Sequence, residues 1–321
     1  MTHNKSVFYN LLKTARPRQW IKNLALYAAL IFSGMLFYVP TDAPAYFLTV
    51  TLAFITFNFI TSSIYIFNDI VDAEADRNHP FKKKRPIASG ALSVRSAKIG
   101  AGVLLIISLI LSFYLTFFFQ LMALAYVLLQ ILYAKFLKHI PIFDVASIAT
   151  GFLIRIYAGA LVVNLHMNVW FLLTVISASL FLAVGKRQSE RTLLSGQSEE
   201  VIGSTRKILK HYTQRLLDQY TGMFATAAWL SYAIYTFQAQ TVVPAAEFTQ
   251  IYTFLPKTLH SQKLLMLTLP FVIFGIMRYL QLIYEKNEGE SPERVLLGDR
   301  TLLTTLFMFG SSVLLIIYVI G

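Results

Sequence analysis

The sequence contains no cysteine and few charged residues. Without cysteine, disulfide bonds, thiolate metal sites and a catalytic thiol are all excluded. Charged residues make up 14% of the chain, whereas a soluble domain has about 25%, so this chain has too little charge to cover a globular surface. Hydrophobic residues make up 56%, and the mean hydropathy is +0.60. The first twenty residues also lack the short apolar core of a cleavable signal peptide. The composition predicts an integral membrane protein.

Long apolar runs recur along the whole chain, and a helix needs roughly 20 such residues to cross the bilayer. We predict an all-α, polytopic membrane protein with nine transmembrane helices. The predicted spans are 23–40, 46–67, 97–118, 120–137, 142–163, 168–185, 219–238, 264–284 and 301–320. No linker or repeat divides them, so we expect a single integral-membrane domain over residues 1–321, with residues 1–22 as a cytoplasmic amphipathic lead-in.

The net charge of +12 is distributed very unevenly. If the connections alternate between the two sides, and Lys98, Lys135 and Arg278 are counted with the connections nearest to them, 25 of the 28 Lys and Arg residues fall on the side of the N-terminus. Such asymmetry indicates that this side is cytoplasmic. Of the 16 acidic residues, only Asp42 and Glu247 lie on the other side. We therefore expect a multi-pass protein of the cytoplasmic (inner) membrane, with its active site facing the cytoplasm. The basic charge suits anionic lipid or substrate, and no nucleic acid partner is expected.

Carboxylates gather directly after the second predicted span, in "NDIVDAEADRNHP" at residues 68–80. If the helix continues, Asn68, Asp72 and Asp76 share one face, because they are four residues apart. An all-oxygen ligand set favours a hard cation, and Mg²⁺ takes one or two carboxylates together with substrate phosphates. Mn²⁺ is a substitute. The alternative is a solvated acidic helix end without metal.

Basic residues follow at once in "RNHPFKKKRPIASG". Arg77 and Arg85 are candidates for binding phosphate, because guanidinium can hold phosphate with two hydrogen bonds. Lys82 is a further candidate, whereas Lys83 and Lys84 are better explained as topology anchors. Carboxylates for Mg²⁺ beside cations for phosphate predict a site for a metal–diphosphate complex.

Further polar residues lie in or beside the later spans: Tyr133, Lys138, Asp144, Arg155, Lys186, Arg187 and Glu190. Arg155 lies about three turns inside a predicted span, where an unpaired charge costs at least ~2.5–3.5 kcal/mol. It should therefore have a partner, and we expect Asp144, three turns back on the same face. A buried ion pair that only joins helices is the alternative. Gly151 and Gly159 on this helix favour close helix packing.

Several stretches together resemble one known family. "NDIVDAEAD" matches the N-D-x-x-D-x-x-x-D motif of the UbiA superfamily of intramembrane prenyltransferases, which have nine transmembrane helices. The wider pattern resembles its decaprenyl-phosphate phosphoribosyltransferase branch. The stretches are "RPRQWIKN" at 16–23, "NDIVDAEADRNHPFKKKRPIASG" at 68–90, "YAKFLKHIPIFDVASIATGFLIRIYAGA" at 133–160, "GKRQSE" at 185–190 and "SPERVLLGDR" at 291–300. They are spread along nearly the whole chain and occur in the family's order.

The resemblance implies a Mg²⁺-dependent enzyme that transfers phosphoribose from phosphoribosyl pyrophosphate to a polyprenyl phosphate, for cell-envelope glycan synthesis. Aromatic prenyltransferases have a second motif, D-x-x-x-D, in which Ile148 here replaces the second carboxylate. The implied catalytic residues are Asp72, Asp76 and Asp144, and the implied metal ligands are Asn68, Asp72 and Asp76. The implied substrate-binding residues are Gln19, Lys22, Asn23, Arg77, Lys82, Arg85, Tyr133, Lys138, Arg155, Lys186 and Arg187. Of these, Gln19 and Lys22 are assigned to the acceptor phosphate.

Two alternatives to this function stay open. One is a prenyltransferase of the same superfamily that moves an isoprenyl chain onto an aromatic acceptor, against which Ile148 argues. The other is a transporter, which should carry ionisable groups near the midplane and on both sides. The isoprenoid length, the number of metal ions and the oligomeric state, a homo-oligomer included, are not determined by the sequence.

Overall fold

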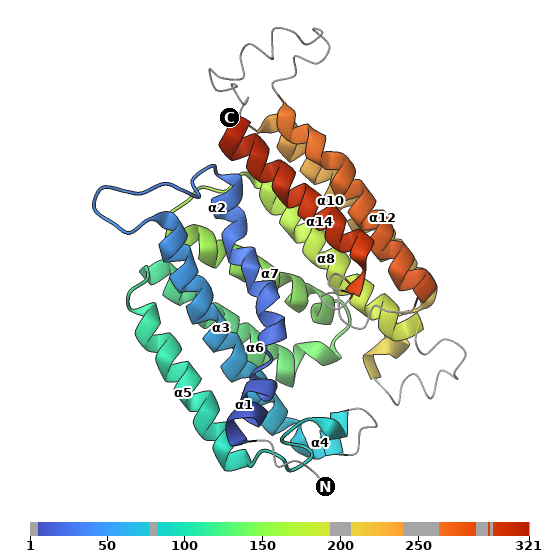
Figure 1. Ribbon diagram of the computed structural model, residues 1–321. Helices are drawn as coiled ribbons and strands as arrows, with labels where there is room; N and C mark the ends of the chain where they lie inside the picture. Colours follow the sequence, from blue (N-terminus) through green and yellow to red (C-terminus); the bar gives the residue numbers. More distant parts are fainter. Residues whose placement is uncertain are drawn as a thin grey trace, which may run out of the picture. The chain divides into compact units, whose positions relative to one another are not determined.

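A computed structural model shows that the described residues form helices and no strand (Figure 1). The structure describes residues 6–77, 82–192, 207–239, 263–286, 295 and 298–320. They fall into two compact units. The predicted all-α class is therefore confirmed, whereas the single-domain assignment stays a prediction.

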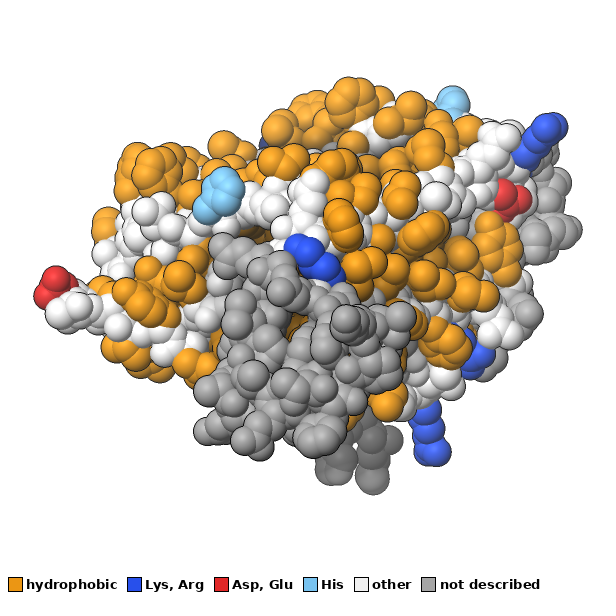
Figure 2. Space-filling view, turned by 90° about the horizontal axis from the view of Figure 1, so that it is seen from above, with side chains coloured by type: hydrophobic (Ala, Val, Ile, Leu, Met, Phe, Trp, Pro, Cys, Tyr) orange, Lys and Arg blue, Asp and Glu red, His pale blue; other side chains and the backbone are white. Residues whose placement is uncertain are grey.

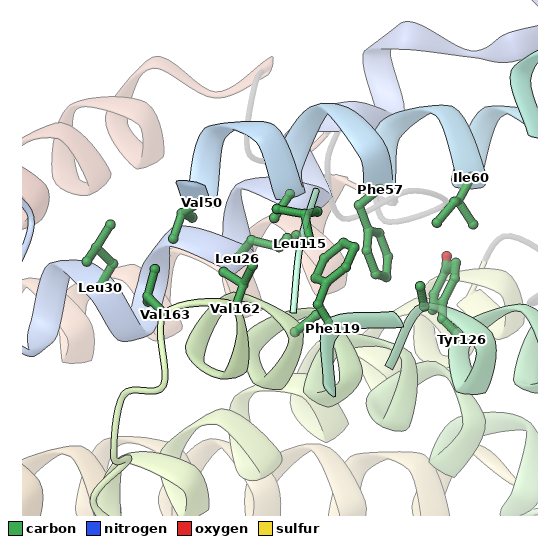
Figure 3. Packing of buried hydrophobic residues seen from close by; sticks show 13 residues of the cluster. Leu26, Leu30, Val50, Phe57, Ile60, Leu115, Phe119, Tyr126, Val162 and Val163 are labelled. Carbon is green, nitrogen blue, oxygen red and sulfur yellow. The ribbon is translucent and has the colours of Figure 1, made fainter. Parts of the chain in front are cut away.

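The first unit contains the described residues of Met1–Leu30, Met35–Lys135 and Ile154–Leu165. Its elements are α1 (Val7–Ala15), the 3₁₀ helix η1 (Pro17–Tyr27), the start of α2 (Ala28–Phe32), α3 (Tyr46–Val71), α4 (Ala73–Arg77), η2 (Lys82–Lys84), α5 (Val94–Ser112), α6 (Phe117–Lys135) and the second half of α7 (Phe143–Val162). The long helix α3 packs against α1, η1, α5 and α6. The core of this unit is apolar: Leu26 and Val50 belong to one buried cluster with Phe57, Phe119 and Tyr126, and the Phe57 ring contacts the other two rings (Figure 3).

The segment that joins α1 to α2 has an unusual conformation. Arg16 ends α1 in the left-handed region, with φ 54°, and Pro17 then begins an 11-residue 3₁₀ helix. Because this helix has three residues per turn, Trp20, Asn23 and Leu26 lie on one face. The Trp20 Nε1 donates to Ser62 Oγ at 3.0 Å, and Leu26 is completely buried. The three-residue spacing therefore places these side chains on the face of η1 that packs against α3.

Gly159 on α7 allows η1 to approach closely, as its position in the span predicted. A Cβ at this position would overlap the backbone carbonyl of Leu26, which cannot move as a flexible side chain could. We expect Gly159→Ala to destabilise the protein by at least about 1–3 kcal/mol, the usual cost of overpacking. Thermal unfolding in detergent measures this loss. Gly102→Ala is the matched control, because a Cβ on Gly102 meets nothing within 4 Å; an equal effect of the two substitutions would contradict the prediction.

The second unit contains the described residues of Ile31–Gly34, Phe136–Leu153 and His166–Gly321. Its elements are the end of α2, η3 (Leu137–His139), the first half of α7, α8 (Val169–Thr192), η4 (Lys207–His211), α10 (Gln214–Gln238), η7 (Leu264–Thr268), α12 (Leu269–Lys286), α14 (Arg300–Leu315) and the π-helical end η8 (Ile316–Ile320). Helix α8 packs along α10, and α12 packs against α8, α10 and α14 (Figure 1).

Seven helices of the described chain are long and apolar enough to cross a membrane, so the predicted count of nine is not confirmed. The seventh predicted span falls on α10, which is helical but is not among the seven. The first predicted span, 23–40, is wrong as a continuous helix. Its 3₁₀ part gives way to α2, which ends at Phe32, and Gly34 follows with φ 76°.

Large apolar side chains cover broad parts of the surface, and charged ones are few on the face in Figure 2 outside the grey atoms. Helices α5, α6 and α14 bury only 17% of their most apolar windows. Exposed phenylalanines such as Phe113, Phe117 and Phe307 lie on or beside these helices. In water such a surface would aggregate, whereas lipid solvates it. The chain is thus a multi-pass integral membrane protein.

Candidate active site

The acidic residues after α3 keep helical spacing across the end of that helix. The Asp72 amide donates to the Asn68 carbonyl at 2.9 Å, and the Asp76 amide donates to the Asp72 carbonyl at 2.8 Å. Both bonds join residue i to residue i+4, so the backbone register continues from α3 into α4 although Asp72 itself is the C-cap of α3. Asn68, Asp72 and Asp76 therefore follow one another at the predicted spacing of one face.

Two buried carboxylates are held by arginines: Asp76, which belongs to this face, and Asp69, which lies beside it. Arg85 Nη1 donates to Asp76 Oδ2 at 2.6 Å and to Asp69 Oδ1 at 3.1 Å. Arg16 also donates to Asp69, and its guanidinium lies 5.1 Å from the centre of the Tyr65 ring. Asp69 and Asp76 are both buried, and these ion pairs compensate their desolvation. Arg85 thus lies where the sequence placed it, beside the carboxylates, and it is bound to them.

The turn after Arg85 is fixed by the core of the first unit. Ile87 and Leu92 are almost completely buried, and they pack in one cluster with Ala15 and Ile66. Gly90 adopts φ 78°, a conformation that glycine takes without steric cost. Burial of the chain on both sides of this turn holds the backbone of Arg85 in one place.

The face formed by Asn68, Asp72 and Asp76 can offer oxygen ligands. Asn68 and Asp72 are half-buried, and within the described ranges neither side chain has a hydrogen bond or ion pair. Asp76 has one oxygen on Arg85, which leaves the other for a cation. No group of three or more His, Cys, Asp or Glu residues in the described chain could hold a metal by itself. The donor set fits Mg²⁺ only if water and substrate phosphate complete the shell.

A second polar group lies inside the first unit, around Arg155. Its Nε donates to Asn23 Oδ1 at 2.7 Å, and its Nη2 donates to the Tyr126 hydroxyl at 2.7 Å. Asn23 in turn donates to Asn58 Oδ1 at 2.6 Å and to Thr61 Oγ1 at 3.2 Å. Arg155 and Asn23 are both buried. The structure therefore brings together two residues predicted to bind substrate, which lie 132 positions apart.

The third group belongs to the second unit and is centred on Asp144, which is fully buried. Arg187 Nε donates to Asp144 Oδ2, and the Tyr212 hydroxyl donates to Asp144 Oδ1, both at 2.6 Å. Arg187, also fully buried, donates from Nη1 to Glu190 Oε2 at 2.7 Å. Both oxygens of Asp144 thus have protein donors. Asp144 was predicted to act in catalysis and Arg187 to bind substrate; in the structure the two side chains form an ion pair.

The expected partnership of Arg155 with Asp144 is wrong. The two residues lie eleven positions apart on the continuous helix α7, and a rise of 1.5 Å per residue separates them by about 16 Å along the axis. Residues three turns apart share a face but cannot touch. Arg155 instead contacts Asn23 and Tyr126, and Asp144 contacts Arg187 and Tyr212.

The other predicted site residues lie at or near the surface of their units. Arg77 and Lys82 are exposed in α4 and η2. The half-buried ones are Gln19 and Lys22 on η1, Tyr133 on α6, Lys138 on η3 and Lys186 on α8. The arrangement alone does not test the role of any predicted site residue, so these roles stay predictions.

Sequence reasoning assigned no site role to Asp69, Arg16, Tyr126 or Tyr212. Asp69 stands inside the acidic motif and Arg16 opens "RPRQWIKN", so both were within reach of the motif argument. Tyr126 and Tyr212 gave no signal. An isolated tyrosine is common in an apolar helix or a connection, and its partners lie 29 and 68 positions away.

Burial raises the pKa of the Tyr212 phenol well above its usual value, and the hydrogen bond to Asp144 raises that pKa further. The hydroxyl therefore stays protonated across the physiological range. It can donate to Asp144 throughout that range, and it adds no pH dependence of its own.

Comparisons with known proteins agree with the helical fold and the acidic motif. Residues 26–192 match the UbiA prenyltransferase family. The decaprenyl-phosphate phosphoribosyltransferase of Mycolicibacterium smegmatis is 36% identical over 93% of this chain and 89% of that protein. The enzyme of the same name from Corynebacterium glutamicum is 33% identical over 98% of this chain and 89% of that protein.

Solved structures show the same fold. A UbiA homologue from Archaeoglobus fulgidus bound to GPP and Mg²⁺ matches with a TM-score of 0.66 and 17% identity, over 97% of this chain and 100% of that chain. A structure of digeranylgeranylglyceryl phosphate synthase matches with a TM-score of 0.54 and 19% identity, over 97% of this chain and 98% of that chain. From the family match and from relatives of this identity along nearly its whole length, the chain belongs to the UbiA prenyltransferase family.

Proposed function

We propose that this protein transfers the 5-phosphoribosyl group of phosphoribosyl pyrophosphate to a polyprenyl phosphate and releases pyrophosphate. The observation that carries the proposal is the similarity to two decaprenyl-phosphate phosphoribosyltransferases, at 33–36% identity over 93–98% of the chain. If Asp144 is the first residue of the D-x-x-x-D motif of aromatic prenyltransferases, Ile148 takes the place of the second carboxylate, which supports the same choice over isoprenyl transfer.

The diphosphate of the donor would be held at the acidic face of the first unit. Asn68, Asp72 and Asp76 would hold Mg²⁺, which supplies positive charge to the leaving pyrophosphate. A solved UbiA homologue of the same fold binds Mg²⁺ together with GPP, which supports this use of a divalent cation. Arg77 and Lys82, both exposed next to this face, would neutralise further phosphate charge.

The acceptor needs no general base. A phosphate monoester has its second pKa near ~6, so most of it is already a dianion at neutral pH. One acceptor oxygen forms the bond to C1 of the ribose, and the C1–O bond to pyrophosphate breaks with its electron pair leaving on pyrophosphate. The protein must then orient two anions and neutralise their charge. We assign Gln19 and Lys22 to the acceptor phosphate, and Lys138 and Lys186 to phosphates of the donor.

Purified protein in detergent tests the proposal directly. It should convert labelled phosphoribosyl pyrophosphate and a polyprenyl phosphate, with Mg²⁺ present, into a labelled lipid-soluble product. Transfer of an isoprenyl group from GPP to an aromatic acceptor, with no transfer from phosphoribosyl pyrophosphate, would replace the proposal with the alternative reaction.

The orientation in the membrane is a separate proposal: the acidic face and its basic neighbours lie on the cytoplasmic side. The chain has no cysteine, so a single introduced cysteine reports on which side of the membrane it lies. Ser89 and Thr41 are both exposed, and they lie in predicted connections on opposite sides of the membrane. In intact cells an impermeant thiol reagent should label Thr41→Cys and spare Ser89→Cys. The reverse labelling would invert the topology. Ser195, in another predicted cytoplasmic connection, lies outside the described residues.

A further inference from the structure

The hydroxyl of Tyr212 joins two parts of the second unit. It donates to Asp144 Oδ1 at 2.6 Å and accepts from the amide of Ile142 at 2.7 Å. Tyr212 is 1% exposed and directly follows η4 in the chain. One side chain therefore holds both the first turn of α7 and the backbone immediately before it.

The backbone that Tyr212 holds is strained. Ile142 has φ 70°, and a β-branched residue in this region is a rare outlier. Such a conformation persists only where its surroundings enforce it, and it is enriched at functional sites. The bond from the Ile142 amide to the Tyr212 hydroxyl supplies this constraint. A second constraint is that η4, directly before Tyr212, packs against η3.

Lys138 lies within the segment that is fixed in this way. It is half-buried in η3, four residues before Ile142. Its backbone is held by the η3–η4 packing on one side and by the Ile142 bond on the other. Arg187, by contrast, is fully buried on two carboxylates. Of the cations on these segments, Lys138 is therefore better placed than Arg187 to meet an incoming phosphate.

We propose that Tyr212 is a positioning residue for donor binding: it fixes the segment from η3 to Ile142, so that Lys138 is presented to a phosphate of the donor. In the same arrangement, Asp144 anchors Tyr212 and Arg187 and does not contact substrate. The inference rests on the proposed function, because Lys138 is assigned a donor phosphate there.

Calorimetric titration of the purified protein with phosphoribosyl pyrophosphate and Mg²⁺ tests the inference without turnover. We expect Lys138→Ala to weaken donor binding by about tenfold or more, as for the loss of a charge-assisted hydrogen bond. Tyr212→Phe should weaken it by about tenfold although it removes no charge. If Tyr212 acts through Lys138, adding Tyr212→Phe to Lys138→Ala should change the dissociation constant by less than about twofold.

The control is Tyr232→Phe, which removes a buried tyrosine hydroxyl in the same unit, bonded to Thr268 Oγ1 at 2.6 Å. It should leave donor affinity unchanged. If Tyr212→Phe does not fold, the same substitution is made together with Ile142→Gly, because glycine adopts positive φ without strain. Wild-type protein that binds no donor overturns the proposed function, and this inference with it. If the wild-type protein binds the donor and Tyr212→Phe binds it equally well, the inference is overturned and the proposed function stands. Full additivity of Tyr212→Phe with Lys138→Ala has the same consequence.

Discussion

Asp72→Ala is expected to abolish transfer from phosphoribosyl pyrophosphate while the protein still folds. Asp72 is half-buried in the turn between α3 and α4, and no described residue pairs with its side chain. Its removal therefore breaks no contact that stabilises the fold. In the proposed site it removes one of two carboxylates on the cation, and we expect a loss of turnover of at least about a hundredfold.

The matched control is Glu74→Ala, two residues further along the chain. Glu74 is exposed on α4, carries the same charge and is not assigned to the cation. Both variants should melt within a few degrees of wild type, and only Asp72→Ala should lose turnover. Excess EDTA should also stop the wild-type reaction. Full activity in EDTA, or equal losses in the two variants, would rule out the assigned metal site.

The sequence predicts the helices well where apolar composition and length decide the outcome. The spans at 46–67, 168–185 and 264–284 lie on long helices of the structure to within one residue, whereas 97–118 covers most of α5 but runs past its end at Ser112 into the start of α6. The prediction of one continuous helix over 23–40 was wrong because hydropathy carries no information about backbone conformation. The 3₁₀ helix that begins at Pro17 continues to Tyr27, inside this span, and α2 ends at Phe32, eight residues before the predicted end.

At the site, the sequence predicted the features that depend on local spacing and did not predict the contacts between residues far apart in the chain. Asn68, Asp72 and Asp76 keep the predicted register because it depends only on i to i+4 hydrogen bonds. The pairing of Arg155 with Asp144 failed because a shared face says nothing about distance along the axis. Asn23 and Arg155 meet where η1 packs on Gly159 of α7; Gly159 predicts close packing, but the sequence does not show that η1 is the segment that packs there.

Arg187→Ala is expected to destabilise the second unit strongly. Arg187 and Asp144 are both 0% exposed, and their side chains meet at 2.6 Å. Among the described residues, removing the guanidinium leaves the Tyr212 hydroxyl as the donor to Asp144, and it also removes the hydrogen bond from Arg187 Nη1 to Glu190 Oε2. Breaking a buried pair by removing one partner costs about 3–5 kcal/mol, because the remaining charge stays desolvated. The thermal midpoint in detergent should fall accordingly.

Arg278→Ala is the matched control, since it breaks another arginine–aspartate pair of the same unit, also at 2.6 Å. The Arg278 side chain is 20% exposed, so water and lipid headgroups can solvate Asp299 once the arginine is gone. The Asp299 side chain is 9% exposed, so the pair is partly and not fully buried, and we expect a clearly smaller loss than for Arg187→Ala. Equal losses would show that burial does not set the cost of these pairs.

The double variant Asp144→Asn with Arg187→Met separates a buried charge from a lost contact. Neutral asparagine can still accept the Tyr212 hydrogen bond through its Oδ1, and methionine fills much of the space of the arginine stem. If the cost of Arg187→Ala comes from the stranded carboxylate, the double variant should recover most of the lost stability, with a coupling energy of about 1–3 kcal/mol. A double variant no more stable than Arg187→Ala would mean that Glu190 and the packing of Arg187, not its charge on Asp144, hold α7 to α8.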